Sequence, residues 1–319
     1  MDLRQTTSAM VSMVDSVERV ITGKRDAVEL ATCALFGSIH LLIEDVPGVG
    51  KTMLARAIAR SIDGTFKRIQ GTSDLLPSDI TGATMYDQAS SSFNFVPGPV
   101  FANVLLFDEI NRTGPKTQSA LLEVMDEGSV SVDGNVYELP RPFFVAATRN
   151  PIEHHGTFPL PEGELDRFGV SIAIGYPDAV AESDVVAKQL VTHPLDELEP
   201  VLSPEDVVAH QNAVRTVHVE RSVLDYVIAV VRATRSQPEV ALGASPRGSV
   251  ALTRGAQAHA VLDGRDFVSP DDVKVMAPSV LAHRVLLTGE VGGTADAARE
   301  IVMRVLDNTE TPVVAARER

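Results

Sequence analysis

The chain has 319 residues, of which 44% are hydrophobic and 22% charged, and its formal net charge at pH 7 is −15. This length and composition allow a substantial buried core and are typical of a globular protein with two domains. The acidic balance argues against sequence-independent binding of nucleic acid, which depends on clustered Lys and Arg side chains that meet phosphates.

Three local features bear on where the protein works. The single cysteine, Cys33, excludes an intrachain disulfide and a multi-cysteine zinc site, and its apolar surroundings indicate a small core residue. The first ten residues, MDLRQTTSAM, lack the apolar segment of a signal peptide. The longest nearly uncharged run, Leu30 to Ile43, is too short to cross a bilayer. We therefore expect a cytoplasmic protein that does not insert directly into a membrane.

Up to about residue 180, helical stretches alternate with short, nearly continuous apolar segments. Segments of this kind suit the strands of a parallel sheet that helices cover on both faces. The predicted strands are His40–Ile43, Thr65–Ile69, Val104–Phe107, Phe143–Ala147 and Val170–Ile174. The fold class expected for this part of the chain is α/β, with a five-stranded parallel sheet.

Two segments interrupt the α/β pattern and are predicted to be insertions. Residues 78–99 are rich in Gly, Ser, Asp and Pro, with Phe93 and Phe95 at strand spacing. Residues 129–142 are predicted to form a hairpin that turns at Asp133-Gly134. Aromatic residues and turns in such loops often belong to surfaces that contact partners.

The rest of the chain is predicted to be all-helical. Ser203-Pro204-Glu205-Asp206 and Ser269-Pro270-Asp271-Asp272 both indicate helix starts, with Ser as the N-cap and Pro at the first helical position. Apolar residues at helical spacing lie between them, at Val223, Leu224, Val227, Ile228 and Val231. We expect an α/β domain of residues 1–192 that contains both insertions, followed by a smaller all-α lid domain of residues 193–319.

The segment Asp45-Val46-Pro47-Gly48-Val49-Gly50-Lys51-Thr52 follows the first predicted strand and precedes a helix-forming run. Glycines let successive backbone N–H groups turn toward a phosphate, and the helix N-terminus adds positive potential. In this P-loop pattern the ammonium of Lys51 reaches the β- and γ-phosphates, and the hydroxyl of Thr52 ligates Mg²⁺. Asp45 stands where the pattern has its first glycine. The alternative is a glycine-rich turn that caps a helix, but the strand–loop–helix context and the Lys-Thr pair favour a phosphate-binding loop.

Two acids, Asp108 and Glu109, end the third predicted strand. Asp108 is suited to hold the hydration shell of Mg²⁺, and Glu109 to polarise the attacking water. Acids after an apolar strand are often only solvated, so the pair gains its meaning from the P-loop upstream. Together the two motifs predict nucleotide hydrolysis rather than nucleotide binding alone.

Three further positions have both a functional and a structural interpretation. Asn150 follows the fourth predicted strand, where it could sense the γ-phosphate or only start a turn. Arg167 is flanked by acids and is either ion-paired or an arginine finger for the next subunit's site, a group that can raise the rate roughly 10³–10⁵-fold. Arg247, in the first turn of a predicted helix, either points at the phosphates from the lid or lies at the surface. His154-His155 lacks further metal ligands nearby and is predicted to be a solvated loop.

Taken together, these segments resemble the MoxR family of AAA+ ATPases. The resemblance covers nearly the whole chain, from about Val20 to the C-terminal helices, and rests on long blocks in a fixed order. The blocks are Leu42–Thr52, Asp74–Gly82, Gly98–Asn103, Asp108–Arg112, Lys116–Met125, Asn150–Glu153, Leu165–Phe168 and Gly243–Arg247. Asp45 in the P-loop also fits the family pattern.

The resemblance implies an ATP- and Mg²⁺-dependent, chaperone-like motor. Members of the family form rings, usually hexamers, with the ATP sites between subunits, and typically work with proteins that carry von Willebrand factor A domains. The resemblance identifies the two insertions as the helix-2 insert and the hairpin before the first sensor. By position, it implies a P-loop pair of Lys51 and Thr52, a magnesium-binding Asp108, a water-activating Glu109, a first sensor at Asn150, a finger at Arg167 and a lid sensor at Arg247.

The chain departs from the family pattern at a few positions. Gly71 and Ser73 stand where Phe and Pro are usual, Arg149 stands where Gln is usual, and His154-His155 and Gly163 are atypical. None of these changes removes a catalytic group. Because Arg149 lies beside Asn150, we expect the hydrolysis rate to be the property that they affect most.

Two other functions fit the same motifs. One is the ATPase motor subunit of a magnesium-chelatase-like complex, which would use the same ATP chemistry. The other is a nucleotide-controlled binding scaffold with little turnover. Adenine specificity rests on the resemblance alone, because no residue identified from the sequence forms a base pocket.

Overall fold

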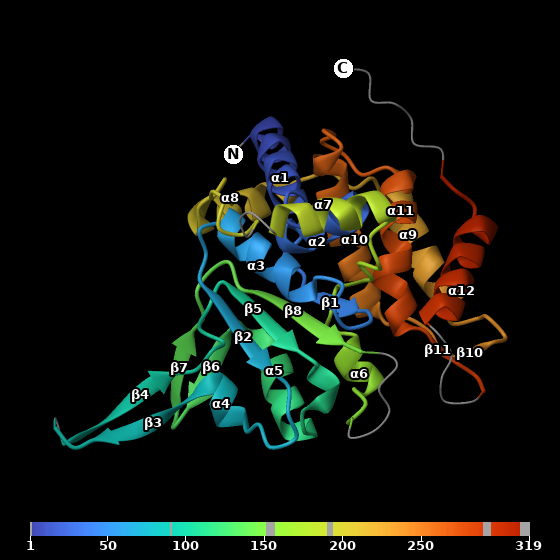
Figure 1. Cartoon of the computed structure of the whole chain (residues 1–319). Coiled ribbons are helices and arrows are strands. Elements are labelled where there is room, and N and C mark those ends of the chain that lie inside the picture. The colour runs from blue at the N-terminus through green and yellow to red at the C-terminus, as the bar shows by residue number, and fades with distance from the viewer. Residues whose placement is uncertain (1, 90, 151–156, 190–193, 290–294, 313–319) are drawn as a thin grey trace.

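The computed structural model describes residues 2–89, 91–150, 157–189, 194–289 and 295–312. Its centre is a five-stranded parallel sheet in the order β2-β5-β8-β1-β9 (Figure 1). These strands are β1 (Leu41–Glu44), β2 (Phe66–Gln70), β5 (Val104–Asp108), β8 (Phe144–Arg149) and β9 (Val170–Ile172). The predicted α/β class and all five predicted strands are confirmed, with strand ends shifted by one or two residues.

Alternate residues of the strands enter two hydrophobic cores on opposite faces of the sheet. Leu41 and Ile43 of β1 belong to one core, and Leu42 belongs to the other. The helices of the first core include α1 (Leu3–Glu18), α2 (Arg25–Phe36) and α3 (Lys51–Ser61), whereas α5 (Pro115–Glu127) covers the second. Because both faces of the sheet are buried, the strands are apolar without alternation. This is the pattern from which the parallel sheet was predicted.

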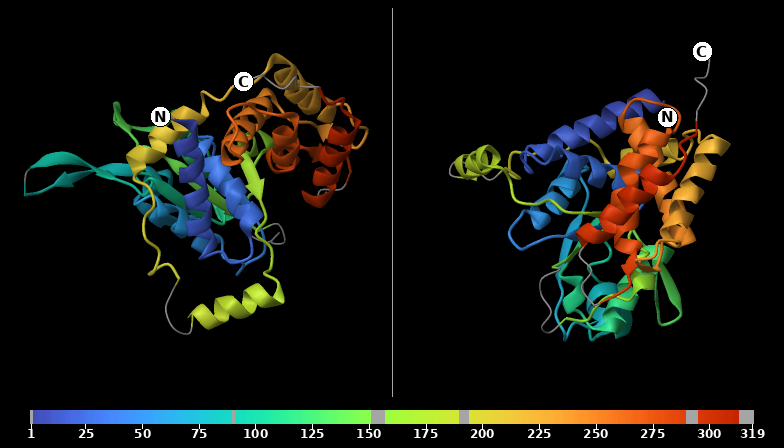
Figure 2. Two further views of the ribbon diagram at one scale, coloured as in Figure 1. Left: turned by 90° about the horizontal axis from the view of Figure 1, so that it is seen from above. Right: turned by 90° about the vertical axis from the view of Figure 1, so that its right-hand side faces the viewer.

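Both insertions contain antiparallel hairpins. Their elements are α4 (Pro77–Thr81), β3 (Gly82–Asp87), β4 (Ser92–Pro97), β6 (Ser129–Val132) and β7 (Asn135–Glu138). The β3–β4 hairpin projects from one side of the molecule, and the C-terminal helices lie on the opposite side (Figure 2, left). The predicted turn of the second hairpin is confirmed, because Asp133 and Gly134 have φ angles of 50° and 80°.

Aromatic side chains form one contact between the two hairpins and another within the first hairpin. Phe95 of β4 stacks on Tyr137 of β7 with 4.0 Å between ring centroids. Tyr86 and Phe93 pair farther out on the first hairpin, where their side chains are exposed. The stacked pair therefore fixes one hairpin against the other, and the exposed pair is available to a partner.

The second half of the chain consists of helices and one short strand pair. The helices are α8 (Pro204–Val214), α9 (Arg221–Thr234), α10 (Pro246–Leu262), α11 (Pro270–Leu281) and α12 (Ala295–Asn308). The predicted helix starts are confirmed, since Ser203 and Ser269 both form capping boxes. Beyond the predicted helices, β10 (Val240–Leu242) and β11 (Leu286–Leu287) form a small antiparallel pair.

The two halves share a hydrophobic core. Helices α1 and α2 pack on α8 and α10, so apolar residues of the N-terminal helices and of the lid form one cluster. Helix α7 (Ala179–Gln189) lies between the halves along the chain. The expected domain boundary after residue 192 falls among residues 190–193, outside the described part of the chain, and stays a prediction. Among the described residues, no helix combines the length and the apolar character needed to cross a bilayer.

His40, just before β1, is hydrogen-bonded on both ring nitrogens. The backbone N–H of Val145 donates to Nδ1 at 3.1 Å, so Nε2 carries the proton and donates to the carbonyl oxygen of Met125 at 3.3 Å. Burial lowers the pKa of His40 from 6.5 to about 4, although the Met125 carbonyl opposes the shift. A proton on Nδ1 would face the Val145 N–H, which explains why the folded chain holds this ring neutral.

We predict that acid weakens the fold through His40. The unfolded chain takes up the proton near pH 6.5, whereas the folded ring resists it down to about pH 4. Stability therefore falls as the pH drops through this window. Between pH 7 and pH 5, His40→Gln, which cannot titrate, should lose about 1–2 kcal/mol less unfolding free energy than the wild type. Urea denaturation of both proteins at both pH values measures this difference, and equal losses would contradict the role of His40.

Candidate active site

The loop between β1 and α3 has the backbone of a phosphate-binding loop. Gly48 and Gly50 have φ angles of 88° and 97°, a region that a side chain would strain. Gly50 is the N-cap of α3, which begins at Lys51. The first N–H groups of a helix have no partner within the helix and point toward an anion placed at its N-terminus.

Asp45 anchors the base of this loop. Its Oδ2 accepts hydrogen bonds from the backbone N–H groups of Ile174 (2.7 Å) and Gly175 (2.6 Å), just beyond β9. Its Oδ1 accepts from the N–H of Val46 at 2.8 Å. A glycine could not make these bonds, which accounts for the aspartate at the position where the general P-loop pattern begins with glycine. The carboxylate is committed to the protein, so only the backbone of Asp45 is left for a nucleotide.

Lys51 and Thr52 occupy the first turn of α3. The ammonium of Lys51 donates to the carbonyl oxygen of Asp45 at 2.6 Å, which holds the side chain across the loop. A carbonyl oxygen is a weaker partner for an ammonium than a phosphate is, because only the phosphate carries a full negative charge. The lysine is therefore placed to exchange this oxygen for a phosphate oxygen.

Thr148 of β8 orients both acids at the end of β5. Its hydroxyl donates to Asp108 Oδ1 at 2.6 Å and accepts from the backbone N–H of Glu109 at 2.8 Å. Glu109 has a φ of 57°, in the left-handed region that non-glycine residues rarely adopt. Such strained residues often lie at functional sites, where the surroundings hold them in place.

Strand β2 supplies partners for the acids that the sequence did not reveal. Arg68 Nη2 donates to Asp108 Oδ2 at 2.6 Å, and Gln70 Nε2 donates to Glu109 Oε2 at 2.8 Å. Both side chains could be found only once β2 was known to pair with β5, in the register that sets Gln70 opposite Asp108. The guanidinium of Arg68 balances the charge of Asp108.

Gly71 lets the acid-bearing turn pack closely against the end of β2. Its N–H donates to the carbonyl oxygen of Asp108 at 2.7 Å. A Cβ atom at this position would lie 2.2 Å from the carbonyl oxygen of Glu109. The glycine, one of the departures from the family pattern, is thus required by this backbone.

The oxygen atoms at this site suit magnesium. Asp108 carries a carboxylate at the end of β5, and Thr52 carries a hydroxyl in the first turn of α3. Mg²⁺ prefers such hard oxygen donors and keeps several waters. Arg68, the present partner of Asp108 Oδ2, is about half exposed, so it can yield this oxygen to a hydrated ion.

Asn150 is buried directly beyond the end of β8. Its neighbour Arg149 forms an ion pair with Glu44 at the paired position of β1. Glu44 also accepts a hydrogen bond from the hydroxyl of Ser171 at 2.9 Å. The charge of Arg149 is therefore balanced by Glu44, which limits its effect on Asn150.

Arg167 and Arg247 meet at one carboxylate. Arg167 follows the short helix α6 (Glu162–Leu165), and Arg247 lies in the first turn of α10. Arg247 Nη2 donates to Asp126 Oδ2 at 3.2 Å, and Arg167 Nε lies 3.2 Å from the same oxygen without hydrogen-bonding geometry. Asp126, near the end of α5, was not among the predicted site residues, because no local pattern marks it.

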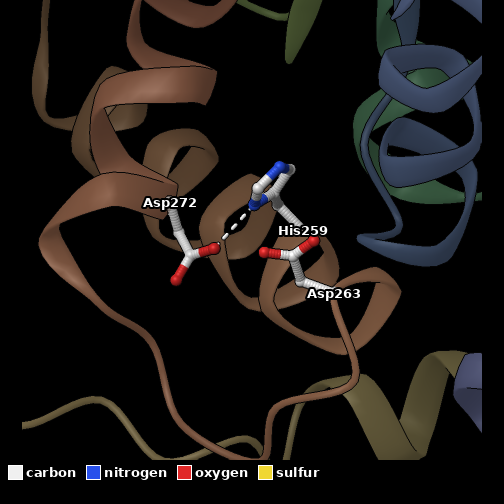
Figure 3. A group of neighbouring side chains, drawn as sticks. All are labelled: His259, Asp263 and Asp272. Carbon is white, nitrogen blue, oxygen red and sulfur yellow. Dashed lines mark hydrogen bonds and ion pairs between the residues drawn. The ribbon is translucent and has the colours of Figure 1, made fainter.

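A separate cluster in the lid also holds candidate metal ligands: His259, Asp263 and Asp272 (Figure 3). Asp272 is fully buried, and Arg265 donates to both of its oxygens at 2.6 Å. His259 Nδ1 lies 2.6 Å from Asp272 Oδ1. Burial acts to raise the pKa of Asp272, but the hydrogen bonds from Arg265 and His259 outweigh it and lower that pKa. The guanidinium already supplies the positive charge, so the cluster is a structural ion pair.

His154-His155, which were predicted to lie in a solvated loop, are outside the described residues.

Comparison with known proteins places this arrangement in a family. The model of the "ATPase family associated with various cellular activities (AAA)" matches residues 40–170, and that of an AAA lid domain matches residues 232–302. YeaC of Bacillus subtilis is 49% identical, over 94% of both chains. Chaperone MoxR1 of Mycobacterium tuberculosis is 42% identical, over 94% of this chain and 81% of its own.

A solved structure agrees along nearly the whole chain. The crystal structure of a proposed ATPase from Cytophaga hutchinsonii superposes with a TM-score of 0.89 and 34% sequence identity. The superposition covers 97% of this chain and 96% of the chain in the crystal structure. The chain belongs to the MoxR family of AAA ATPases.

Proposed function

We propose that the protein is a chaperone-like motor that hydrolyses Mg-ATP to remodel or activate protein complexes. One observation carries the catalytic part of this proposal. Strands β5, β8 and β1 are neighbours in a parallel sheet, so Asp108-Glu109, Asn150 and the P-loop emerge side by side at one edge. Ligands of open α/β sheets bind at this carboxyl edge.

Each of these groups has a distinct proposed task. The P-loop glycines and Lys51 bind the phosphates, and Thr52 and Asp108 hold Mg²⁺, which neutralises charge on the transferred phosphoryl group. Glu109 orients and polarises the attacking water, since its backbone is fixed by Thr148. Asn150 contributes a neutral amide close to the γ-phosphate.

The two arginines are proposed to complete a neighbour's site. For Arg247, which was expected from the sequence to face the phosphates from the lid, this changed proposal rests on the carboxylate of Asp126 that it shares with Arg167. About a quarter of the Arg167 side chain is exposed, and its Nε lies 3.2 Å from Asp126 without forming a hydrogen bond, so the other N–H donors of the guanidinium can bind another anion. Phosphate oxygens of a bound nucleotide are such an anion. We infer a homo-oligomeric ring, a hexamer as is usual for the family, in which each site takes Arg167 and Arg247 from the next subunit.

The client surface is proposed to lie on the β3–β4 hairpin. Phe93 is 73% exposed and Met85 60% exposed, on a hairpin that projects from the body (Figure 1). Exposed apolar side chains on a projecting hairpin favour contact with another protein. The partner that family resemblance suggests is a protein with a von Willebrand factor A domain.

Replacing Glu109 by Gln should separate binding from turnover. Glu109→Gln keeps the size of the side chain and one acceptor oxygen but cannot act as a base, so steady-state phosphate release should fall about 100-fold or more. Binding of a fluorescent ATP analogue should stay within a few-fold of wild type, whereas Lys51→Ala should lose it. Glu123→Gln, an exposed acid on α5, is the matched control and should change neither property. Normal phosphate release by Glu109→Gln would contradict its assigned role, and wild-type release no faster than that of Lys51→Ala would identify a scaffold.

Mixing variants tests the shared site. The Arg167→Ala subunit keeps an intact P-loop but supplies no arginine to the neighbouring site. The Lys51→Ala subunit has an inactive P-loop but still supplies its arginine. In a random equal mixture, half of the sites have an intact P-loop and half of these meet an intact arginine, so about a quarter of wild-type activity should return. Each variant alone should be strongly impaired. A mixture no more active than its components would rule out the sharing of sites.

A further inference from the structure

A buried arginine joins the lid to the segment that carries Arg167. Arg284 ends the short helix η2 (Ala282–Arg284), and only 2% of its side chain is exposed. Its Nε donates to Asp166 Oδ1 at 2.9 Å, and its Nη2 donates to the carbonyl oxygens of Asp166 at 3.0 Å and Phe168 at 2.6 Å. Nη1 donates to the carbonyl oxygen of Gly169 at 3.2 Å. One guanidinium therefore holds the chain between α6 and β9 at several points.

The carboxylate of Asp166 has a second partner in the lid. Ser245, the N-cap of α10, donates its hydroxyl to Asp166 Oδ2 at 2.6 Å. The same hydroxyl accepts the backbone N–H of Arg247 at 3.0 Å. Asp166 directly precedes Arg167, so this network ties together the backbones of the two arginines that meet at Asp126.

We propose that Arg284 is a positioning residue that presents Arg167 and Arg247 as one pair to the neighbouring subunit's nucleotide. It touches no nucleotide itself. The inference rests on the proposed function, because it assumes that the pair acts across a subunit boundary. Two guanidiniums can bind one triphosphate together only if their separation is held nearly constant, and Arg284 and Ser245 provide this constraint.

If Arg284 only stabilised the fold, its loss would also reduce activity. The decisive question is therefore whether Arg284 affects the ATP site of its own subunit or that of the neighbouring subunit. A residue that serves only the donated pair leaves its own subunit's P-loop and acids intact. Arg284→Gln should therefore behave in mixtures as Arg167→Ala does and not as Lys51→Ala does. These two behaviours define complementation groups that phosphate release can distinguish.

The experiment mixes Arg284→Gln separately with each of the other two variants. With Lys51→Ala we expect recovery to about a quarter of wild-type phosphate release, by the same statistics as for Arg167→Ala. With Arg167→Ala we expect no recovery, because neither subunit gives a working pair. Recovery with Arg167→Ala but not with Lys51→Ala would overturn the inference, since Arg284 would then serve its own site. Recovery with neither, while Arg167→Ala and Lys51→Ala still complement, would also overturn it. Failure of that reference pair would instead refute the shared site itself.

Two further variants guard against misfolding. Ser245→Gly removes the bond to Asp166 but keeps a residue that is tolerated at helix N-caps, so it should show a partial loss in the same complementation group. If sedimentation shows that Arg284→Gln does not assemble, Ser245→Gly replaces it in the mixing experiment. Recovery of phosphate release when Ser245→Gly is mixed with Arg167→Ala, but not with Lys51→Ala, would overturn the inference. Arg265→Gln is the matched control, because Arg265 binds the buried Asp272 entirely within the lid. It should lower the melting temperature while phosphate release below that temperature is retained.

Discussion

The parallel register of β5, β8 and β1 is the constraint on which the site depends. Ala146 of β8 lies opposite Leu41 of β1 and Leu106 of β5, so the three strands run level with one another. A shift of one residue in either pairing would move every side chain of the strand to the other face and exchange its core. It would also separate Thr148 from Asp108. The two hydrophobic cores that fix this register thus also fix the hydrogen bond that orients the acids.

At the carboxyl edge of the sheet, arginines pair with the acids. Arg68 meets Asp108, Arg149 meets Glu44, and Arg112 lies 3.4 Å from Glu109. Arg68 and Arg112 are about half exposed, and exposed pairs contribute little to stability. In the proposed function, Mg²⁺ would take the place of Arg68 at Asp108, the predicted magnesium ligand.

Sequence reasoning predicted the elements and the local motifs, because strands, caps, the P-loop and the Asp-Gly turn each depend on neighbouring residues. It missed Arg68, Thr148, Asp126 and Arg284. Each acts on a residue far along the chain, as Thr148 does on Asp108 and Arg284 does on Asp166, 40 and 118 positions away. No periodicity or spacing encodes such pairs; they follow only from the strand order and from the docking of the lid. Even Asp45, which was predicted within the loop, owes its identity to Ile174 and Gly175 beyond β9.

The departures from the family pattern gain a physical meaning from the same contacts. Arg149, which was expected to affect the hydrolysis rate through Asn150, pairs with Glu44 across the β1–β8 pairing, and its effect on the rate stays a prediction. Gly71 is the more consequential change. A Cβ at this position would overlap the carbonyl oxygen of Glu109, so a larger residue here would require the acid-bearing turn to lie farther from β2. Because Glu109 already has a strained backbone, a small displacement of that turn would change the orientation of its carboxylate. The glycine thus sets how closely the turn that carries Glu109 packs against the end of β2.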